Sequence, residues 1–229
     1  MKEWLITPDR FLSKNELGKL LQRADELWTI GTAKKQKQAI REWVGIRVAI
    51  LSGLRASEIT NLKVSECYVG YGKSEVLVRN GKGGKSRIVK IGADLKKDLR
   101  WYLKWKSEQG ENDNSEYLLR SQRGNKLTAN GIWRRWKAYC PNHRLHDSRH
   151  TYATMLYESS RDIRLVQKQL GHSRITTSSV YADVCDEQAR EGIDAMEKAV
   201  NHAMKLPKDC ELAKNLPDKP GRIAGKIAS

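Results

Sequence analysis

The chain has 229 residues, of which 39% are hydrophobic and 31% are charged, and its formal net charge is +16. This composition is that of a globular protein and excludes a fibrous or intrinsically disordered chain. The most apolar stretch, "VGIRVAIL", is too short for a membrane span, and the N-terminus has no apolar signal region, so no membrane partner is expected. The excess of positive charge favours a polyanionic partner such as nucleic acid.

Helical periodicity dominates the first sixty residues. Leucines recur at helical spacing within residues 7–27, at Leu17, Leu20, Leu21 and Leu27. Residues 34–62 predict a second, more apolar helix that ends at the turn of Ser52 and Gly53, followed by a short helix from about Ala56.

The period then changes to that of a β-hairpin. The runs "SEVLVRN" (74–80) and "SRIVKIG" (86–92) flank the glycine-rich turn "GKGGK". Helical patterns return at residues 93–109, 128–140, 146–160 and 161–171, with a short helix around Tyr181 and a longer one over residues 186–204. The chain is therefore expected to be mainly α with a small antiparallel β-sheet, an α+β fold.

Domain organisation follows from where the periodicity stops. Residues 1–205 are expected to form one domain, and residues 206–229, with three prolines, a flexible basic tail. The four cysteines lack CxxC spacing, which argues against a zinc site and for a reduced, cytoplasmic chain; they are Cys67, Cys140, Cys185 and Cys210.

The stretch "LHDSRHTYAT" (145–154) places His146, Arg149 and His150 at the start of a predicted helix. Residues three apart share a helix face, so His146 and Arg149 lie together. A metal site needs further ligands that this helix does not supply. Taken alone, the pair fits a surface arginine with partly buried histidines at least as well as a phosphate site.

Two further stretches add basic groups. In "SGLRASEI", Arg55 follows a glycine turn at a helix start, with Glu58 one turn later. Arg55 can present its planar fork to a phosphate with Glu58 holding it, or the two can form an ordinary surface ion pair. In "RNGKGGKSR", Lys82 and Lys85 can reach DNA from a hairpin turn, or belong to a solvated basic turn.

A last stretch, "LGHSRITTSSVYADV" (170–184), places His172 behind a glycine turn and Tyr181 in a segment of small residues. Tyr181 can equally be a half-buried structural residue. The ordered set of "GLRASEI", "GKGGKSR", "LHDSRHTYAT" and "LGHSRITTSSVYADV" closely resembles the motifs of the tyrosine recombinases, the phage integrase family. The resemblance covers about residues 5–200.

The resemblance implies a DNA strand-cleaving and rejoining enzyme, acting on double-stranded DNA without metal, cofactor or ATP. Tyr181 would attack the scissile phosphate to give a 3′-phosphotyrosyl link, while Arg55 and Arg149 hold its non-bridging oxygens. His146 would act as general acid or base and His172 would bind a phosphate oxygen. Lys82 would protonate the leaving 5′ oxygen. Supporting roles fall to Glu58, His150 and Lys85.

The match departs from the family before residue 5, because no N-terminal core-binding domain is evident. The expected function is site-specific recombination or integration, by a homo-oligomer (a tetramer on DNA) or with an accessory protein. Relaxation of the type IB topoisomerase kind and a catalytically silent DNA-binding regulator with the same fold remain alternatives. A helical RNA-binding module fits the charge but lacks an RNP-type strand or a GxxG loop in the right context.

Overall fold

A computed structural model describes residues 10–79, 86–110, 117–122 and 124–185, together with residues 193 and 196. The chain divides into two compact units, Met1–Asp186 and Glu187–Ser229. The predicted tail (206–229) lies outside the described residues, as does nearly all of the predicted helix 186–204. In the ranges that are described, no helix has the length and hydrophobicity needed to cross a membrane.

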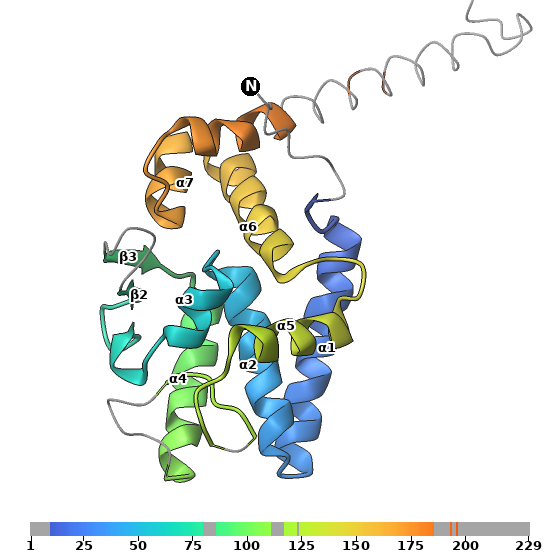
Figure 1. Cartoon of the computed structure of the whole chain (residues 1–229), viewed down its shortest axis with the longest axis vertical. Coiled ribbons are helices and arrows are strands. Elements are labelled where there is room, and N and C mark those ends of the chain that lie inside the picture. The colour runs from blue at the N-terminus through green and yellow to red at the C-terminus, as the bar shows by residue number, and fades with distance from the viewer. Residues whose placement is uncertain are drawn as a thin grey trace, which may run out of the picture. The chain divides into compact units, whose positions relative to one another are not determined.

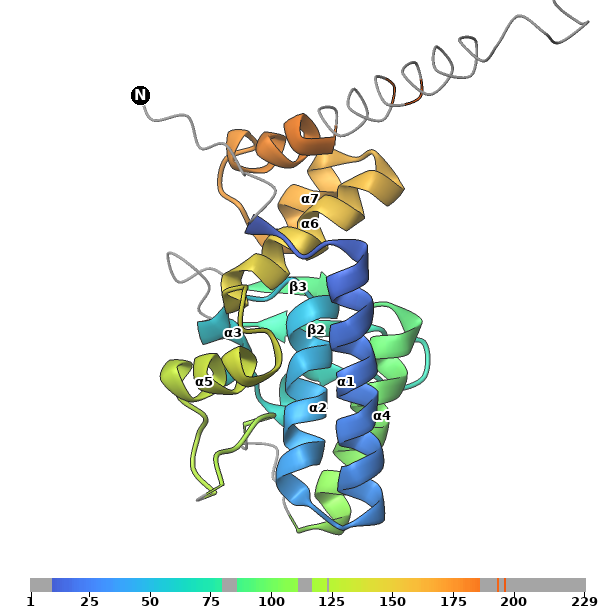
Figure 2. The same cartoon turned by 90° about the vertical axis from the view of Figure 1, so that its right-hand side faces the viewer.

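Two long helices form the frame of the first unit. Helix α1 (Lys14–Ala33) begins with a capping box, in which the Ser13 side chain accepts from the Glu16 N–H and the Glu16 carboxylate accepts from the Ser13 N–H. Helix α2 (Lys37–Leu51) lies beside α1, and α4 (Ala93–Glu108) packs on α2 (Figures 1 and 2). Their facing side chains, among them Val44 and Leu99, are fully buried in the main core.

The chain turns sharply between α2 and α3 (Ala56–Asn61) at Gly53, whose φ is +63°. A Cβ at this position would lie 2.4 Å from Cδ1 of Tyr152, so the turn requires glycine for its backbone conformation and for its space. The carbonyl of Gly53 is thereby placed against helix α6 (Leu145–Ser160), which carries Tyr152.

The sheet follows α3 through a short 3₁₀ helix, Val64–Glu66. Its antiparallel strands are β1 (Cys67–Tyr68), β2 (Glu75–Val78) and β3 (Arg87–Lys90), in that order. Val76 of β2 pairs with Val89 of β3, and both are buried. The predicted hairpin is confirmed, whereas β1 was not predicted because two residues show no alternation of apolar and polar side chains.

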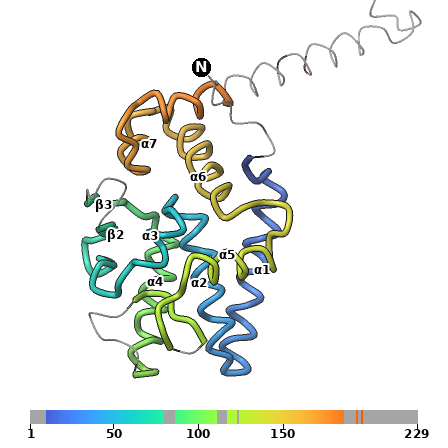
Figure 3. The backbone as a smooth tube through the Cα atoms, viewed as in Figure 1, coloured from blue at the N-terminus to red at the C-terminus, as the bar shows by residue number. Residues whose placement is uncertain are grey.

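The C-terminal elements of this unit build a second, smaller core. Helix α5 (Ala129–Tyr139) leads into α6, which is followed by α7 (Ile163–Leu170) and a helix over residues 176–185 (Figure 3). Ala153, Val166, Leu170 and Tyr181 are buried together between α6, α7 and this last helix. Helix α7 also contacts β3, so the sheet edge and the C-terminal helices meet. The predicted class, mainly α with a small antiparallel sheet, is confirmed for the part of the chain that the structure describes.

Candidate active site

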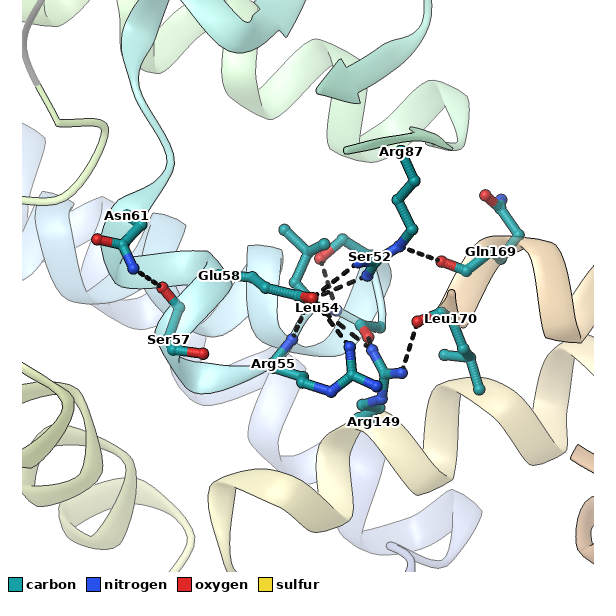
Figure 4. A network of polar contacts seen from close by, with 11 residues as sticks. Ser52, Leu54, Arg55, Ser57, Glu58, Asn61, Arg87, Arg149, Gln169 and Leu170 are labelled. Atoms are coloured by element: carbon teal, nitrogen blue, oxygen red, sulfur yellow. Dashed lines mark hydrogen bonds and ion pairs between the residues drawn. The ribbon is translucent and has the colours of Figure 1, made fainter. Parts of the chain in front are cut away.

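The carboxylate of Glu58 lies among three arginines at the junction of α3, β3 and α6 (Figure 4). Arg55 precedes the first residue of α3 and donates to Glu58 through its backbone N–H at 2.8 Å and through Nη1 at 3.0 Å. Arg87 of β3 donates to both carboxylate oxygens, at 2.7 and 2.9 Å. Burial raises the pKa of Glu58, but the bonds from Arg87 and Arg55 outweigh it and lower this pKa to about 2.

Arg149 of α6 is the third arginine, and its side chain is only 2% exposed. Nη1 donates to the carbonyl of Gly53 at 2.6 Å and Nη2 to that of Leu170 at 2.7 Å. Its Nη1 lies 3.9 Å from Glu58. Burial, followed by the positive charge of Arg55, lowers the pKa of Arg149 to about 10, so the group stays charged at neutral pH.

The segment after α7 brings His172 and Tyr181 to the same place. Gly171, with φ +67°, ends α7 in a left-handed turn. His172 Nδ1 lies 2.9 Å from Oγ of buried Ser178, and the His172 ring stacks on that of Tyr181 with centroids 6.4 Å apart. Burial, then Arg149, Arg55 and Arg87, lower the pKa of His172 to about 4.

Tyr181 is 2% exposed and its hydroxyl lies 3.1 Å from Nδ1 of His150. His146, one turn earlier on α6, contacts the edge of the His150 ring, with centroids 4.7 Å apart. Burial raises the pKa of Tyr181 to about 12, although Arg149 and Arg55 oppose this. The pKa of His146 is lowered, first by burial and then by Arg149. The structure therefore places His150, expected only to support the site, against the Tyr181 hydroxyl.

The structure brings together seven of the residues singled out in the sequence, from the start of α3, from α6 and from the segment after α7: Arg55, Glu58, His146, Arg149, His150, His172 and Tyr181. Lys82 and Lys85 lie outside the described residues, and their roles stay predictions. Within the described ranges, no three His, Cys, Asp or Glu side chains are grouped so as to hold a metal ion.

Sequence reasoning missed Arg87, Gln169 and Ser178. Arg87 and Val89 are two apart on β3 and share a sheet face, and Val89 is fully buried, so strand alternation was the available signal for an inward-facing Arg87. The side-chain amide of Gln169 accepts from the backbone N–H of Lys90 at 2.9 Å and donates to the carbonyl of Lys90 at 3.0 Å. These two hydrogen bonds join α7 to β3. No local pattern marks Gln169 for this role.

Known proteins are similar in sequence over most of this chain. Tyrosine recombinase XerA from Pyrococcus horikoshii is 33% identical over 190 residues, which cover 80% of this chain and 60% of that protein. Tyrosine recombinase XerD from Oceanobacillus iheyensis is 31% identical over 185 residues, covering 77% and 58% respectively. The chain spans about half to three fifths of the length of the curated relatives it matches.

Solved structures agree with these relatives. The crystal structure of XerA recombinase matches with a TM-score of 0.66 and 26% identity, over 84% of this chain and 65% of that one. The post-cleavage complex of XerH recombinase with palindromic difH matches with a TM-score of 0.66 and 25% identity, over 82% and 53%. A lambda integrase dimer, at 18% identity and a TM-score of 0.53, shows the fold alone.

The fold and the polar cluster define a tyrosine recombinase catalytic domain. The sequence profile of the phage integrase family matches residues 10–188, and the chain belongs to this family. The resemblance found in the sequence motifs is thereby confirmed, while the chemical role of each residue stays a prediction.

Proposed function

We propose that this chain cleaves and rejoins strands of double-stranded DNA through a 3′-phosphotyrosyl intermediate, as a site-specific recombinase or integrase. The observation that carries the proposal is the charge balance of the cluster. Three guanidinium groups surround the single carboxylate of Glu58, and the two neighbouring histidines with pKa values of about 4 are neutral at pH 7. The net positive charge supports binding of an anion such as a phosphodiester.

The rigidity of this cluster suits transition-state stabilisation. Arg149 is held by two backbone carbonyls and Arg55 by Glu58, so their remaining N–H groups are oriented before DNA binds. Preorganised donors stabilise the charge that develops on the phosphate oxygens as Tyr181 attacks. We assign His172 to a phosphate oxygen, His146 to acid or base chemistry, and Lys82 to the leaving 5′ oxygen.

These residue roles also bear on religation, on assembly and on where the protein acts. The covalent link conserves the energy of the phosphodiester bond, so religation requires no ATP, and the arginine pair takes the part that Mg²⁺ plays elsewhere. We propose that the protein works as a homo-oligomer, a tetramer on DNA, or with an accessory protein, and that residues 1–205 form the catalytic domain ahead of a basic tail. Since the substrate is DNA and Cys67, Cys140 and Cys185 are free thiols, we place the activity in the cytoplasm.

Covalent trapping tests the proposal. The protein is incubated in EDTA with labelled duplexes nicked so that the strand bearing the 5′-hydroxyl is lost after cleavage. The substrates are palindromic duplexes patterned on the difH DNA of the XerH complex, a library of randomised sites and DNA flanking the gene. We expect a protein–DNA adduct on a denaturing gel with the wild-type chain and none with Tyr181→Phe.

The outcomes separate the alternative functions. Binding without an adduct on any of these substrates overturns the enzymatic proposal and favours a silent DNA-binding regulator. Processive relaxation of a supercoiled plasmid that carries no selected site favours the topoisomerase-like alternative. Strand exchange between two selected duplexes supports recombination.

A further inference from the structure

The hydroxyl of Tyr181 is buried and has a specific neighbour. Its Oη lies 3.1 Å from Nδ1 of His150, and the two rings are tilted by 47° with centroids 5.9 Å apart. A phenol keeps its proton at neutral pH and must lose it as its oxygen bonds to phosphorus. A group at hydrogen-bond distance from this oxygen is therefore the first candidate to receive the proton.

The other two histidines near Tyr181 are placed differently. His172 stacks on the face of the Tyr181 ring, with an interplanar angle of 13°, and its Nδ1 bonds to Ser178. His146 lies edge-on against His150, with an interplanar angle of 89°. The ring order is thus His146, His150, Tyr181 and His172, and the nitrogen at hydrogen-bond distance from the hydroxyl is that of His150.

The surroundings of His150 keep its imidazole neutral before DNA binds. Burial is the main cause that lowers its pKa to about 4, followed by charge repulsion from four groups on several segments, of which the two histidines repel only when they are protonated. These four groups are His146 and Arg149 of α6, Arg10 ahead of α1, and His172 after α7. A phosphate bound at Arg55 and Arg149 brings a negative charge that stabilises the imidazolium, so substrate binding raises the basicity of His150.

We propose, on the basis of the function proposed above, that His150 rather than His146 is the catalytic proton acceptor for Tyr181. This refines the acid or base role assigned above to His146, whose ring packs against that of His150. In the forward step the Oη–P bond forms and the P–O5′ bond breaks. The phenolic proton passes to Nδ1 of a neutral imidazole whose own proton is on Nε2, and the leaving 5′ oxygen takes a proton from a separate acid, Lys82 in our assignment. In religation the P–O5′ bond forms and the Oη–P bond breaks. The attacking 5′-hydroxyl gives its proton to the neutral amine of the same group that served as acid, Lys82 in our assignment, and His150 returns its proton to the leaving phenolate oxygen.

Two substitutions at His150 separate proton transfer from simple positioning. His150→Asn keeps a polar group near the position of Nδ1 without a basic nitrogen, and His150→Ala leaves space for added imidazole. The rate of adduct formation on the nicked duplex is measured for both, with Tyr181→Phe as the blank and with near-UV circular dichroism and DNA affinity as checks of the fold. We expect both variants to lose about 100-fold or more in rate, with DNA affinity changed less than about twofold. Imidazole should restore part of the rate of His150→Ala only.

The results divide cleanly between this inference and the function on which it rests. A wild-type chain that forms no adduct overturns the proposed function and this inference with it. A wild-type adduct with His150→Asn within about threefold of the wild-type rate leaves the function standing and overturns the role of His150 as base. A rate for His150→Ala that does not respond to imidazole overturns that role too. Loss in both variants with selective rescue of His150→Ala supports it.

Discussion

Arg87 and Glu58 face each other fork to fork, with Nη1 donating to Oε1 at 2.7 Å and Nη2 donating to Oε2 at 2.9 Å. Arg87 also donates from Nε to the carbonyl of Gln169 at 3.2 Å. Residue 169 directly precedes Leu170, whose carbonyl accepts from Arg149. Arg87 therefore orients the carboxylate that holds Arg55, and it also contacts the backbone next to the residue that holds Arg149. The sheet edge is in this way part of the site.

The first prediction concerns this fork. Arg87→Lys keeps the charge but loses the two parallel hydrogen bonds, so Glu58 and Arg55 lose their fixed geometry. We expect adduct formation to slow by about 10-fold to 100-fold, because small misplacements of a catalytic charge are costly, with little change in DNA affinity. The matched control is Arg79→Lys. Arg79 also forms an ion pair with a glutamate, Glu66, but its side chain is 62% exposed. Equal effects of the two substitutions would contradict the role given to Arg87.

The second prediction separates the two arginines assigned to the phosphate. Arg149→Ala and Arg55→Ala should each slow cleavage by about 100-fold to 1000-fold, since each removes a preorganised donor. Their effects on folding should differ. Arg149→Ala leaves two buried carbonyls without their donor and should lower the free energy of unfolding by about 3 kcal/mol. The side chain of Arg55 is 24% exposed, so Arg55→Ala should lower the free energy of unfolding by less than about 1 kcal/mol.

Urea unfolding and adduct kinetics on the same preparations check both parts of this prediction. Equal losses of stability in the two variants would show that the burial of Arg149 has no energetic consequence. Loss of DNA affinity as large as the loss of rate would show that the arginines act in binding rather than in the chemical step.

The third prediction tests the turn between α2 and α3. Gly53→Ala forces a side chain into the left-handed region and places its Cβ 2.4 Å from Tyr152, so we expect about 3 kcal/mol lower stability. Gly72→Ala is the matched control, because Gly72 has φ +69° and no atom within 4 Å of an added Cβ. It should cost only about 1 kcal/mol for the backbone strain. Urea midpoints measure the difference, and equal costs would exclude the contact with Tyr152 as its cause.

The fourth prediction is a pH dependence of stability. The pKa of His172 is about 4 in the folded chain, and the ordinary value for a histidine is 6.5. Between these values the unfolded state binds more protons, so folding stability falls as the pH is lowered from about 6.5 to 4. His172→Asn removes this titration, and its free energy of unfolding should decline less steeply over the same range.

Urea unfolding of both chains at half-unit pH steps measures this slope, with pH 8 as the reference at which the histidine is neutral in both states. The difference seen at pH 8 reports the contacts of the neutral ring that are lost, with Ser178 and with the ring of Tyr181. Parallel curves from pH 8 to pH 4 would contradict the lowered pKa.

Local sequence was sufficient for most of the secondary structure. Leucine spacing located α1, the Ser52–Gly53 turn located the end of α2 and the start of α3, and a helical pattern that stops at Gly171 located α7. The glycine-rich turn between two alternating runs similarly predicted β2 and β3. Strand β1 was not predicted, because its two residues form a strand only by pairing with β2 and show no pattern of their own.

The sequence by itself determined which chemical groups this protein has and in what order, and the motif resemblance was enough to identify the family. Only the tertiary structure decided which of them touch. Arg87 reaches Glu58 across 29 positions of sequence, and His150 reaches Tyr181 across 31. Such contacts depend on how β3, α6 and α7 pack around a shared core, and packing of distant segments leaves no periodic signature in any one of them.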